Sequence, residues 1–340
     1  GTANPTYFLA LSGGGADGAF GAGLLCGWTI EGSRPEFTVV TGISTGALIA
    51  PFAFLGPEYD EPLRFFYTTV RTREIATSRF ILRALAGDAI MDTAPLRRLM
   101  SEVVDEDMMA AIAAENAKGR ILVVGTTNID ADRAVIWNIG AIAASGHPDA
   151  LQLIRDVLIA SAAIPAAFPP VMIDVKVDEE PFQEMHLDGA TRAQVFLYPP
   201  SLELRAEAAA RGVERERVAY VILNTRLERQ WASVPRRTIP IARRAIGSLI
   251  NANAIGDLFR IYLTARRDNV AFNLAYIPST FDAEAVEGFD PEYMTALFNL
   301  GFKLGSLPGG YPWATSPPGW TETTEPIPVD ASTLSGDQTP

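Results

Sequence analysis

Two apolar segments, each followed by a glycine turn and an apolar helix, constrain the fold of this chain most strongly. The first, residues 7–11, runs into three consecutive glycines and then into the apolar, small-residue-rich stretch 18–30. The second, residues 37–41, meets a glycine and continues into the apolar stretch 45–55. Strand, turn and helix in repeated alternation are typical of parallel strands joined by crossover helices. The sequence therefore predicts an α/β fold with a mainly parallel sheet.

Later segments continue this alternation. Strands are predicted over 121–127, 134–139, 171–175, 185–187, 218–224 and 270–277. Helices are predicted within 61–118, one of them starting at Pro95, and over 150–163, 202–211, 239–266 and 291–304. The sequence leaves open whether the helix over 239–266 is continuous. From about Pro308 the chain is rich in Pro, Thr, Ser and Gly, so we expect one domain over 1–307 and a tail over 308–340.

Composition excludes several classes of protein. With 48% hydrophobic and 20% charged residues among 340, the chain can bury a large core. Its net charge of −12 argues against nucleic acid as a partner. No run of 18 apolar residues predicts a membrane span. The single cysteine, Cys26, cannot form an intramolecular disulfide, and no Cys/His set predicts a metal site.

The beginning of the chain leaves the compartment open. The first predicted strand starts at about Tyr7, so no signal peptide fits within these residues. Residue 1 is Gly rather than Met, which indicates processing or trimming. A cytoplasmic location and export after removal of a signal are both compatible with this start.

Gly42-Ile43-Ser44-Thr45-Gly46 has the Gly-x-Ser-x-Gly pattern of a nucleophile elbow. In such an elbow a sharp turn from strand to helix holds the serine hydroxyl out at the carboxyl end of the sheet, and Gly42 and Gly46 avoid clashes. A small-residue turn that happens to contain serine is the alternative. The position between an apolar β-segment and an apolar helix favours the elbow, with Ser44 as nucleophile.

Gly13, Gly14 and Gly15 form a second candidate element. Consecutive glycines after a strand let backbone N–H groups approach a ligand, as an oxyanion hole requires. With Gly18 they also satisfy the G-x-G-x-x-G pattern of dinucleotide binding. That pattern needs an acidic residue at the end of the second strand, where this chain has Thr41-Gly42. No lysine follows the glycines, so a phosphate-binding P-loop is excluded.

The choice of a base for Ser44 is narrow, because the chain has only two histidines, His147 and His186. Neither fits the familiar orders of Ser, His and Asp along a chain. A Ser–His pair using His186 stays open as an alternative, and His147 beside Pro148 is expected in a loop. A carboxylate that acts directly on the serine is the economical choice. Asp188, followed by the small residues Gly189 and Ala190, is the best candidate, with an ordinary Asp-Gly turn as its alternative.

Taken together, these blocks resemble the patatin-like phospholipase family. The matching stretches are residues 13–18, 42–46, 160–170 and 188–190, in the family's order and spacing, and the resemblance covers roughly 7–225. It implies a three-layer α/β/α sandwich around a mainly parallel sheet. It also implies a Ser–Asp dyad with Ser44 as nucleophile and Asp188 as base, and an oxyanion hole in the glycine loop.

The resemblance further implies that phospholipids, neutral glycerides or other acyl esters are substrates, and that no metal or cofactor is needed. One position departs from the family pattern: Asp17 stands where the family usually has Arg or Lys. A carboxylate there puts a preference for anionic phospholipids in doubt but removes no backbone donor. We expect Asp188 to be partly desolvated and within hydrogen-bond reach of Ser44, because burial raises a carboxyl pKa and improves the base.

Residues 226–267 are basic, with nine arginines against two acids. Such a segment is typical of a solvated helix face whose arginines pair with acids elsewhere. The alternative is a surface that meets anionic lipid headgroups, so peripheral membrane contact stays open. A lipid-binding protein that keeps this fold without turnover is the alternative outside the enzymes. The oligomeric state, lipid class and chain length lie beyond these patterns.

Overall fold

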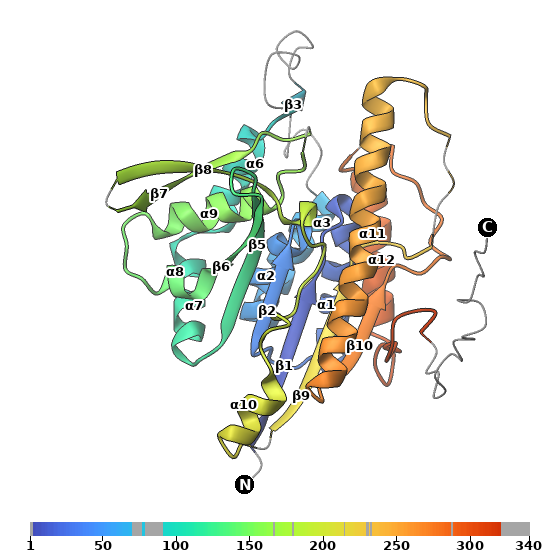
Figure 1. Ribbon diagram of the computed structural model, residues 1–340. Helices are drawn as coiled ribbons and strands as arrows, with labels where there is room; N and C mark the ends of the chain where they lie inside the picture. The colour runs from blue at the N-terminus through green and yellow to red at the C-terminus, as the bar shows by residue number, and fades with distance from the viewer. Residues whose placement is uncertain are drawn as a thin grey trace, which may run out of the picture.

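The computed structural model describes residues 3–69, 77–78, 91–165, 167–178, 180–213, 215–228, 231, 233–286 and 288–320. A central sheet with helices on both faces dominates this part of the chain (Figure 1). The predicted mainly parallel α/β architecture is thereby confirmed. No helix in the described ranges is both long and apolar enough to cross a bilayer.

Five parallel strands form the main part of the sheet. They are β1 (Ala3–Leu11), β2 (Val39–Ile43), β5 (Ile121–Asn128), β9 (Arg215–Leu223) and β10 (Ala271–Tyr276). Their order across the sheet is β10-β9-β1-β2-β5, with all four neighbouring pairs parallel. Because crossover helices return the chain to the same edge, the carboxyl ends of these strands meet at one edge of the sheet.

An antiparallel extension continues the sheet beyond β5. It consists of β6 (Arg133–Asn138), β7 (Val171–Val177) and β8 (Glu180–Asp188). Strand β6 pairs with β5 over Val123 to Asn128, so it occupies one edge of β5. On the other edge β2 pairs as far as Gly125, and β8 takes over from Thr126. Strands β2 and β8 therefore approach one another end to end along β5.

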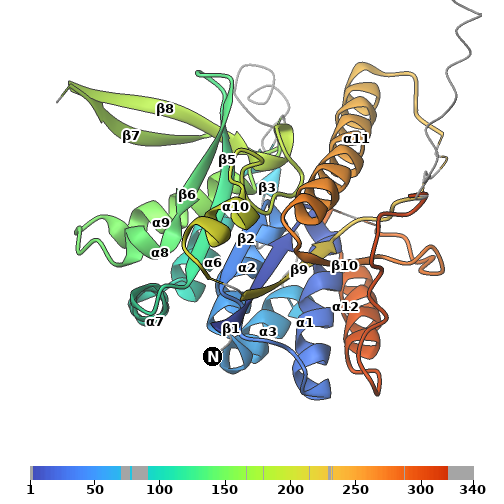
Figure 2. The ribbon, with the colours of Figure 1, turned by 60° about the horizontal axis from the view of Figure 1, so that its bottom comes forward.

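Helices cover the two faces of the sheet and bury two cores. The helices are α1 (Gly18–Glu31), α2 (Thr45–Leu55), α3 (Asp60–Thr69), α6 (Ala94–Val103), α7 (Glu106–Ala117), α8 (Ile139–Ala143), α9 (Ala150–Ser161), α10 (Leu204–Ala210), α11 (Thr238–Arg267) and α12 (Pro291–Gly305). Side chains alternate along β1: Leu9 and Leu11 join the core under α1, α2 and α12, while Phe8 and Ala10 join the core under α11. Figure 2 shows α11 near the β9–β10 end of the sheet and the β7–β8 hairpin at the opposite end.

Helices α1 and α12 pack closely because glycines line their contact. A Cβ atom at Gly23 would lie 2.0 Å from the carbonyl oxygen of Phe298, and one at Gly27 would lie 2.2 Å from that of Phe302. On the facing helix, a Cβ at Gly301 would lie 2.3 Å from the carbonyl oxygen of Phe20. Only residues without a side chain permit this approach of two backbones.

The structure completes or changes several of these predictions. The helix predicted over 239–266 is continuous from Thr238 to Arg267. The strand predicted over 185–187 is the end of the nine-residue β8, whose exposed residues 180–183 lack the apolar alternation of a half-buried strand. Residues 308–320 continue along the edge of the sheet, where Ala314 bridges Leu274. The boundary at 307 stays a prediction, and residues 321–340 lie outside the described ranges.

We predict that Gly23→Ala destabilises the protein by roughly 1–3 kcal/mol, because the new methyl group must displace the backbone of α12. Gly256→Ala in α11 is the matched control, since a Cβ there meets nothing within 4 Å. It should stabilise the protein by roughly 0.5–1 kcal/mol through helix propensity. Denaturant unfolding measures both. Equal effects of the two substitutions would contradict the close packing of α1 and α12.

Candidate active site

Ser44 occupies a strained turn between β2 and α2. Its φ of 54° and ψ of −125° are rarely adopted by a residue with a side chain. The flanking glycines make this turn possible: a Cβ at Gly46 would lie 2.3 Å from the carbonyl oxygen of Leu11, and one at Gly42 would lie 2.5 Å from that of Gly46. This is the geometry of the predicted elbow, and it holds Ser44 at the N-terminus of α2.

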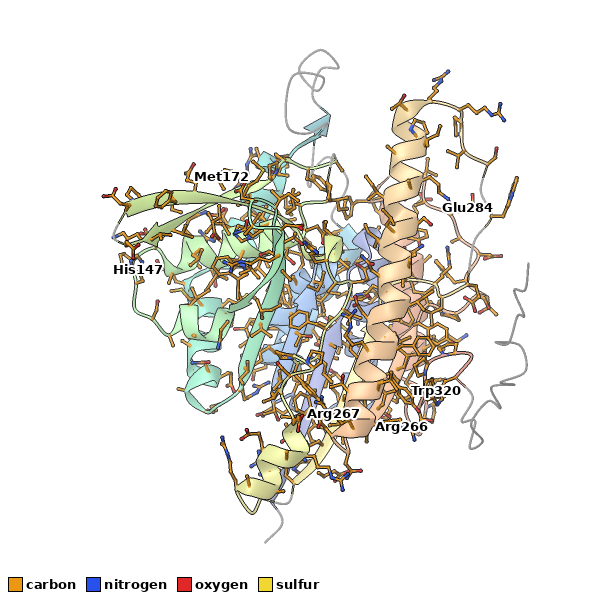
Figure 3. The ribbon with its side chains drawn as sticks, in the orientation of Figure 1. His147, Met172, Arg266, Arg267, Glu284 and Trp320 are labelled. Atoms are coloured by element: carbon orange, nitrogen blue, oxygen red, sulfur yellow. The ribbon has the colours of Figure 1, made fainter. Side chains whose placement is uncertain are left out.

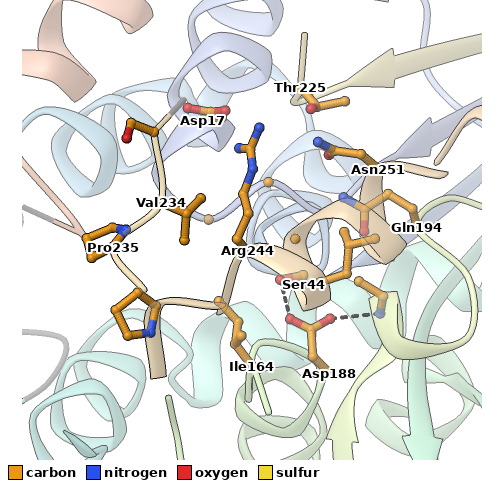
Figure 4. A pocket seen from close by; sticks show the side chains of 17 residues that line it. Asp17, Ser44, Ile164, Asp188, Gln194, Thr225, Val234, Pro235, Arg244 and Asn251 are labelled. Atoms are coloured by element: carbon orange, nitrogen blue, oxygen red, sulfur yellow. Dashed lines mark hydrogen bonds between the residues drawn. The ribbon is translucent and has the colours of Figure 1, made fainter. Parts of the chain in front are cut away.

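Ser44 and Asp188 are in direct contact. The hydroxyl of Ser44 donates a hydrogen bond to Oδ2 of Asp188 at 2.7 Å, and the amide of Ala190 donates to Oδ1 at 2.8 Å (Figure 4). Asp188 is only 3% exposed. Burial raises the pKa of Asp188 to about 7, against the opposing effect of these two hydrogen bonds. The expectation that Asp188 is desolvated and within hydrogen-bond reach of Ser44 is confirmed.

Two neighbouring strand ends place this pair. Ile43 pairs with Gly125 of β5, and Asp188 pairs with the next residue, Thr126. Gly189 then passes so close to β5 that a Cβ would lie 2.5 Å from the carbonyl oxygen of Gly125. The absence of a side chain at Gly189 therefore lets the end of β8 reach the elbow.

Ser161 is a positioning residue to which the sequence patterns assigned no role. It is fully buried at the end of α9. Its hydroxyl accepts a hydrogen bond from the amide of Ser44 at 2.9 Å and donates one to the carbonyl oxygen of Gly125 at 2.7 Å. The side chain thus ties the elbow to β5. It lies in the stretch 160–170 that resembles the family, which was the available signal.

The glycine loop lies beside the elbow, and Asn224 fixes it. This buried residue follows β9, and its side chain accepts from the amide of Gly21 and donates to the carbonyl oxygen of Ser12. A Cβ at Gly14 would lie 2.1 Å from the carbonyl oxygen of Asn224. The loop therefore packs directly on the end of β9. Asn224 closes a predicted strand, but nothing local marks it as a support for a loop more than two hundred residues earlier.

The three glycines of the loop differ in whether they face the pocket or are hydrogen-bonded within the protein. The amide of Gly13 donates to the carbonyl oxygen of Gln194 at 3.1 Å, so it is already used inside the protein. Gly14 and Gly15 line the pocket that contains Ser44 and Asp188. Gly15 has a φ of +60°, a left-handed conformation that favours glycine. Gly18 starts α1, where a Cβ would lie 2.2 Å from the hydroxyl oxygen of Thr45.

The pocket above Ser44 has a volume of about 520 Å³. One wall is formed by α11 and the segment before it, with Ile250, Val234 and Pro235 among its apolar residues. Figure 4 shows Arg244 reaching from α11 toward the side of the pocket where Asp17 and Asn251 lie. The pocket therefore combines apolar walls with a polar end that carries both charges.

Asp17 lies at this polar end, on the short helix that follows the glycine loop. Its carboxylate accepts a hydrogen bond from the hydroxyl of Tyr293. Burial raises the pKa of Asp17, while the hydrogen bond from Tyr293 and the charge of Arg226 lower it. The residue that departs from the family pattern is thus held by α12 rather than turned freely toward the pocket.

Neither histidine contacts Ser44. His186 is fully buried, with Nδ1 2.9 Å from the hydroxyl of Thr126 and Nε2 3.3 Å from a carboxylate oxygen of Glu184. Burial lowers its pKa, although Glu184 opposes the shift. His147 lies in an exposed loop at the outer side of the molecule (Figure 3). Within the described ranges, no three His, Cys, Asp or Glu side chains gather in a way that could bind a metal ion.

The pKa of Asp188 predicts a change of stability with pH. The folded protein keeps the proton of Asp188 up to about pH 7, whereas the unfolded chain releases it near pH 4. The folded state therefore binds more protons across this window, and the free energy of unfolding falls as the pH rises through it. Asp188→Asn should remove this part of the fall, on the order of 4 kcal/mol. Urea unfolding of both proteins between pH 4 and 8 measures it, and parallel curves would contradict the buried carboxyl.

Comparison with known proteins shows the family of this chain. The sequence matches the patatin-like phospholipase family over residues 9–199, more than half of the chain. Among solved structures it is similar to VipD from Legionella pneumophila, with 12% identity and a TM-score of 0.43. The match covers 88% of this chain and 65% of VipD, so the chain spans less than two thirds of that protein. No curated protein matches the chain. The protein belongs to the patatin-like phospholipase family.

Proposed function

We propose that this protein is a serine acyl-hydrolase of the phospholipase A or esterase type, with Ser44 as nucleophile and Asp188 as its base. The observation that carries the proposal is the 2.7 Å hydrogen bond from the Ser44 hydroxyl to the buried carboxylate of Asp188. A carboxylate with an ordinary pKa near 4 is a poor partner for a serine proton at neutral pH. With its pKa raised to about 7, Asp188 is better matched to accept and return that proton.

In the acylation step, the Ser44 oxygen attacks the carbonyl carbon of the ester while its proton passes to Asp188. The carbonyl oxygen gains the negative charge of the tetrahedral intermediate. When the intermediate collapses, the bond to the alcohol oxygen breaks and Asp188 returns the proton to that oxygen. The alcohol leaves, and the acyl group remains on Ser44. In the second step Asp188 takes a proton from water while the water oxygen attacks the acyl carbon. When this second intermediate collapses, the bond to the Ser44 oxygen breaks, Asp188 returns the proton to that oxygen, and the fatty acid leaves.

We assign the oxyanion hole to the amides of Gly14 and Gly15. Both glycines line the pocket with Ser44, whereas the amide of Gly13 donates its hydrogen bond to the carbonyl oxygen of Gln194. The N-terminus of α2 adds a favourable partial charge near the same oxygen. Loss of one such donor typically costs about 3 kcal/mol of transition-state stabilisation. Gly42, Gly46, Gly18 and Gly189 support the site through their close contacts.

Two other functions stay as alternatives to this proposal. In a Ser–His hydrolase, His186 would have to leave Thr126 and Glu184 to reach Ser44, and burial makes that costly. A lipid-binding protein without turnover would need no proton acceptor at Ser44. The strained elbow also favours catalysis over binding, since backbone strain is commonly retained at functional sites.

Single substitutions in the pair should abolish turnover. We expect Ser44→Ala and Asp188→Asn each to lower kcat on a soluble p-nitrophenyl ester by about a thousandfold or more, because each removes one half of the proton transfer. The kcat of His186→Gln should stay within about tenfold of the wild-type value, because His186 is hydrogen-bonded to Thr126 and not to Ser44. The measurement is steady-state kinetics on protein shown to be folded by circular dichroism. An Asp188→Asn protein that keeps most of its activity would contradict the proposed dyad of Ser44 and Asp188.

A fluorophosphonate probe separates the hydrolase from the lipid-binding alternative. It should label the folded wild type at Ser44 and leave Ser44→Ala unlabelled. Fatty-acid release from phospholipids, lysophospholipids and glycerides, with Ser44→Ala as control, then identifies the substrate class. A folded wild type that takes no label favours the binding protein.

The rate should also follow the ionisation of Asp188. Since the base must be deprotonated, kcat/KM for a soluble ester should rise with pH and level off above a pKa of about 7. The profile is measured with a substrate that does not itself titrate in this range. A rate that is flat from pH 5 to pH 8 would contradict the role of Asp188.

A further inference from the structure

Helix α11 divides into two halves that differ in burial. Its inner half, residues 254–267, packs on the sheet through buried side chains such as Leu258, Ile261 and Tyr262. In its outer half, residues 238–253, none of the described side chains is buried. A helix gains most of its stability from burying an apolar face. Within the described part of the chain, the outer half is at most partly buried and gains much less of this stabilisation.

The outer half nevertheless exposes large apolar side chains. Ile241 is 52% exposed and Leu249 is 66% exposed. Helical geometry places them, together with the exposed Ile255 and Leu263, within about 120° of one another around the helix. Trp231, in the segment that leads to α11, is 90% exposed. Apolar side chains gathered on one exposed face indicate a surface that meets a partner.

The same region is positively charged. Residues 231–256 contain four arginines and no acidic residue, in a chain whose net charge is −12. Arg236 and Arg237 are exposed and form no ion pair within the described ranges. In the inner half, by contrast, Arg260 and Arg267 pair with the acids that neighbour them. Within the described ranges, pairing with acids therefore accounts for Arg260 and Arg267 but not for Arg236 and Arg237.

This surface adjoins the pocket of Ser44. Pro240, Arg244, Gly247 and Asn251 recur every three or four residues and form one wall of the pocket. Ile241 and Leu249 lie on a different side of the same helix, toward solvent. The outer half of α11 thus separates the pocket from an exposed face that is apolar and cationic.

We propose that the start of α11 is a docking surface for an anionic lipid bilayer. Arg236 and Arg237 would meet the phosphates of the headgroups, while Ile241 and Leu249 enter the interface beside the pocket mouth. A second copy of the chain is a poorer occupant, because a twofold contact would bring these arginines against one another. The proposal that the partner is a bilayer rests on the proposed lipid substrate. Binding to the bilayer does not itself require catalysis.

The first test measures the binding of Ser44→Ala protein to phosphatidylcholine vesicles with and without phosphatidylglycerol. We expect preference for the anionic vesicles, and weaker binding as salt is added. Arg236→Gln with Arg237→Gln should weaken binding to anionic vesicles by about thirtyfold, since each arginine near the surface contributes roughly fivefold. Arg205→Gln with Arg211→Gln makes the same charge change on and just after α10, at the opposite end of the molecule in Figure 1, and should leave binding unchanged.

The second test removes the apolar contribution. Ile241→Ser with Leu249→Ser should lower vesicle binding at least tenfold and leave hydrolysis of a soluble ester by the otherwise wild-type protein within about twofold. Ile30→Ser is the control for loss of an exposed apolar side chain, because Ile30 lies near the end of α1 and is 70% exposed. Thermal unfolding shows whether each variant keeps the fold. A variant that fails to fold is replaced by Ile241→Ala with Leu249→Ala, which preserves helix propensity.

Several outcomes overturn the docking surface. One is binding that is indifferent to salt and to phosphatidylglycerol. Another is a loss of vesicle binding in the variant Arg205→Gln with Arg211→Gln that equals the loss in Arg236→Gln with Arg237→Gln. A third is a concentration-dependent dimer that Ile241→Ser with Leu249→Ser abolishes, without vesicle binding by the parent protein. The failure of the two proposals can be told apart. If the protein hydrolyses soluble esters but does not bind vesicles, only the proposed docking surface is rejected. If it binds vesicles but does not react with a fluorophosphonate, only the proposed hydrolase activity is rejected.

Discussion

The arrangement of the whole site depends on how two strands share one edge of β5. Strand β2 pairs with that edge up to Gly125, and β8 pairs with it from Thr126 onward in the opposite direction. The chain must turn out of the sheet where the two strands meet. Ser44 lies on the turn that leaves β2, and Asp188 lies at the end of β8, so one backbone pairing brings two residues 144 positions apart into hydrogen-bond contact. Gly189 and Ser161 support the same junction.

Burial gives this junction its chemical character. Asp188 lies at the end of an interior strand, and no described side chain supplies a cation that would hold its pKa down; its raised pKa follows from desolvation. His186, two residues earlier on β8, is buried as well, but its ring is engaged by Thr126 and Glu184. The carboxyl is therefore the titratable group that faces Ser44. The proposed hydrolysis needs such a group, and a lipid-binding protein would not.

Helix α11 connects the site to the outside of the molecule. It contributes a wall of the pocket through one side and leaves another side in solvent. Its inner half is held by the sheet, while the described side chains of its outer half are at most partly buried. An enzyme whose substrates lie in a bilayer needs its pocket to open at a surface that a bilayer can contact. The distribution of charge and apolar side chains along α11 meets that need.

Local sequence determined the class of fold and much of the site. Apolar segments followed by glycine turns predicted the strands β1 and β2, the helices α1 and α2 and the elbow at Ser44, because each depends on the conformational preferences of neighbouring residues. The same patterns predicted most of the later strands and helices to within a few residues. They missed α8, the two-residue strands Thr77–Ser78 and Met91–Asp92 and the exposed first half of β8, and they left the continuity of α11 open.

The tertiary structure alone decided which groups meet. The sequence favoured Asp188 as the partner of Ser44 and kept His186 as an alternative, and only the pairing of β8 with β5 brings the carboxylate to the serine. Asn224 and Ser161 had no assigned role until the ends of β9 and α9 were placed against the glycine loop and the elbow. Strand pairing and burial depend on segments far apart in the chain, so local patterns do not encode them. The sequence by itself therefore supplied Ser44, its turn and Asp188 as the favoured base, and the fold supplied the contact between them and the buried environment that raises the pKa of Asp188.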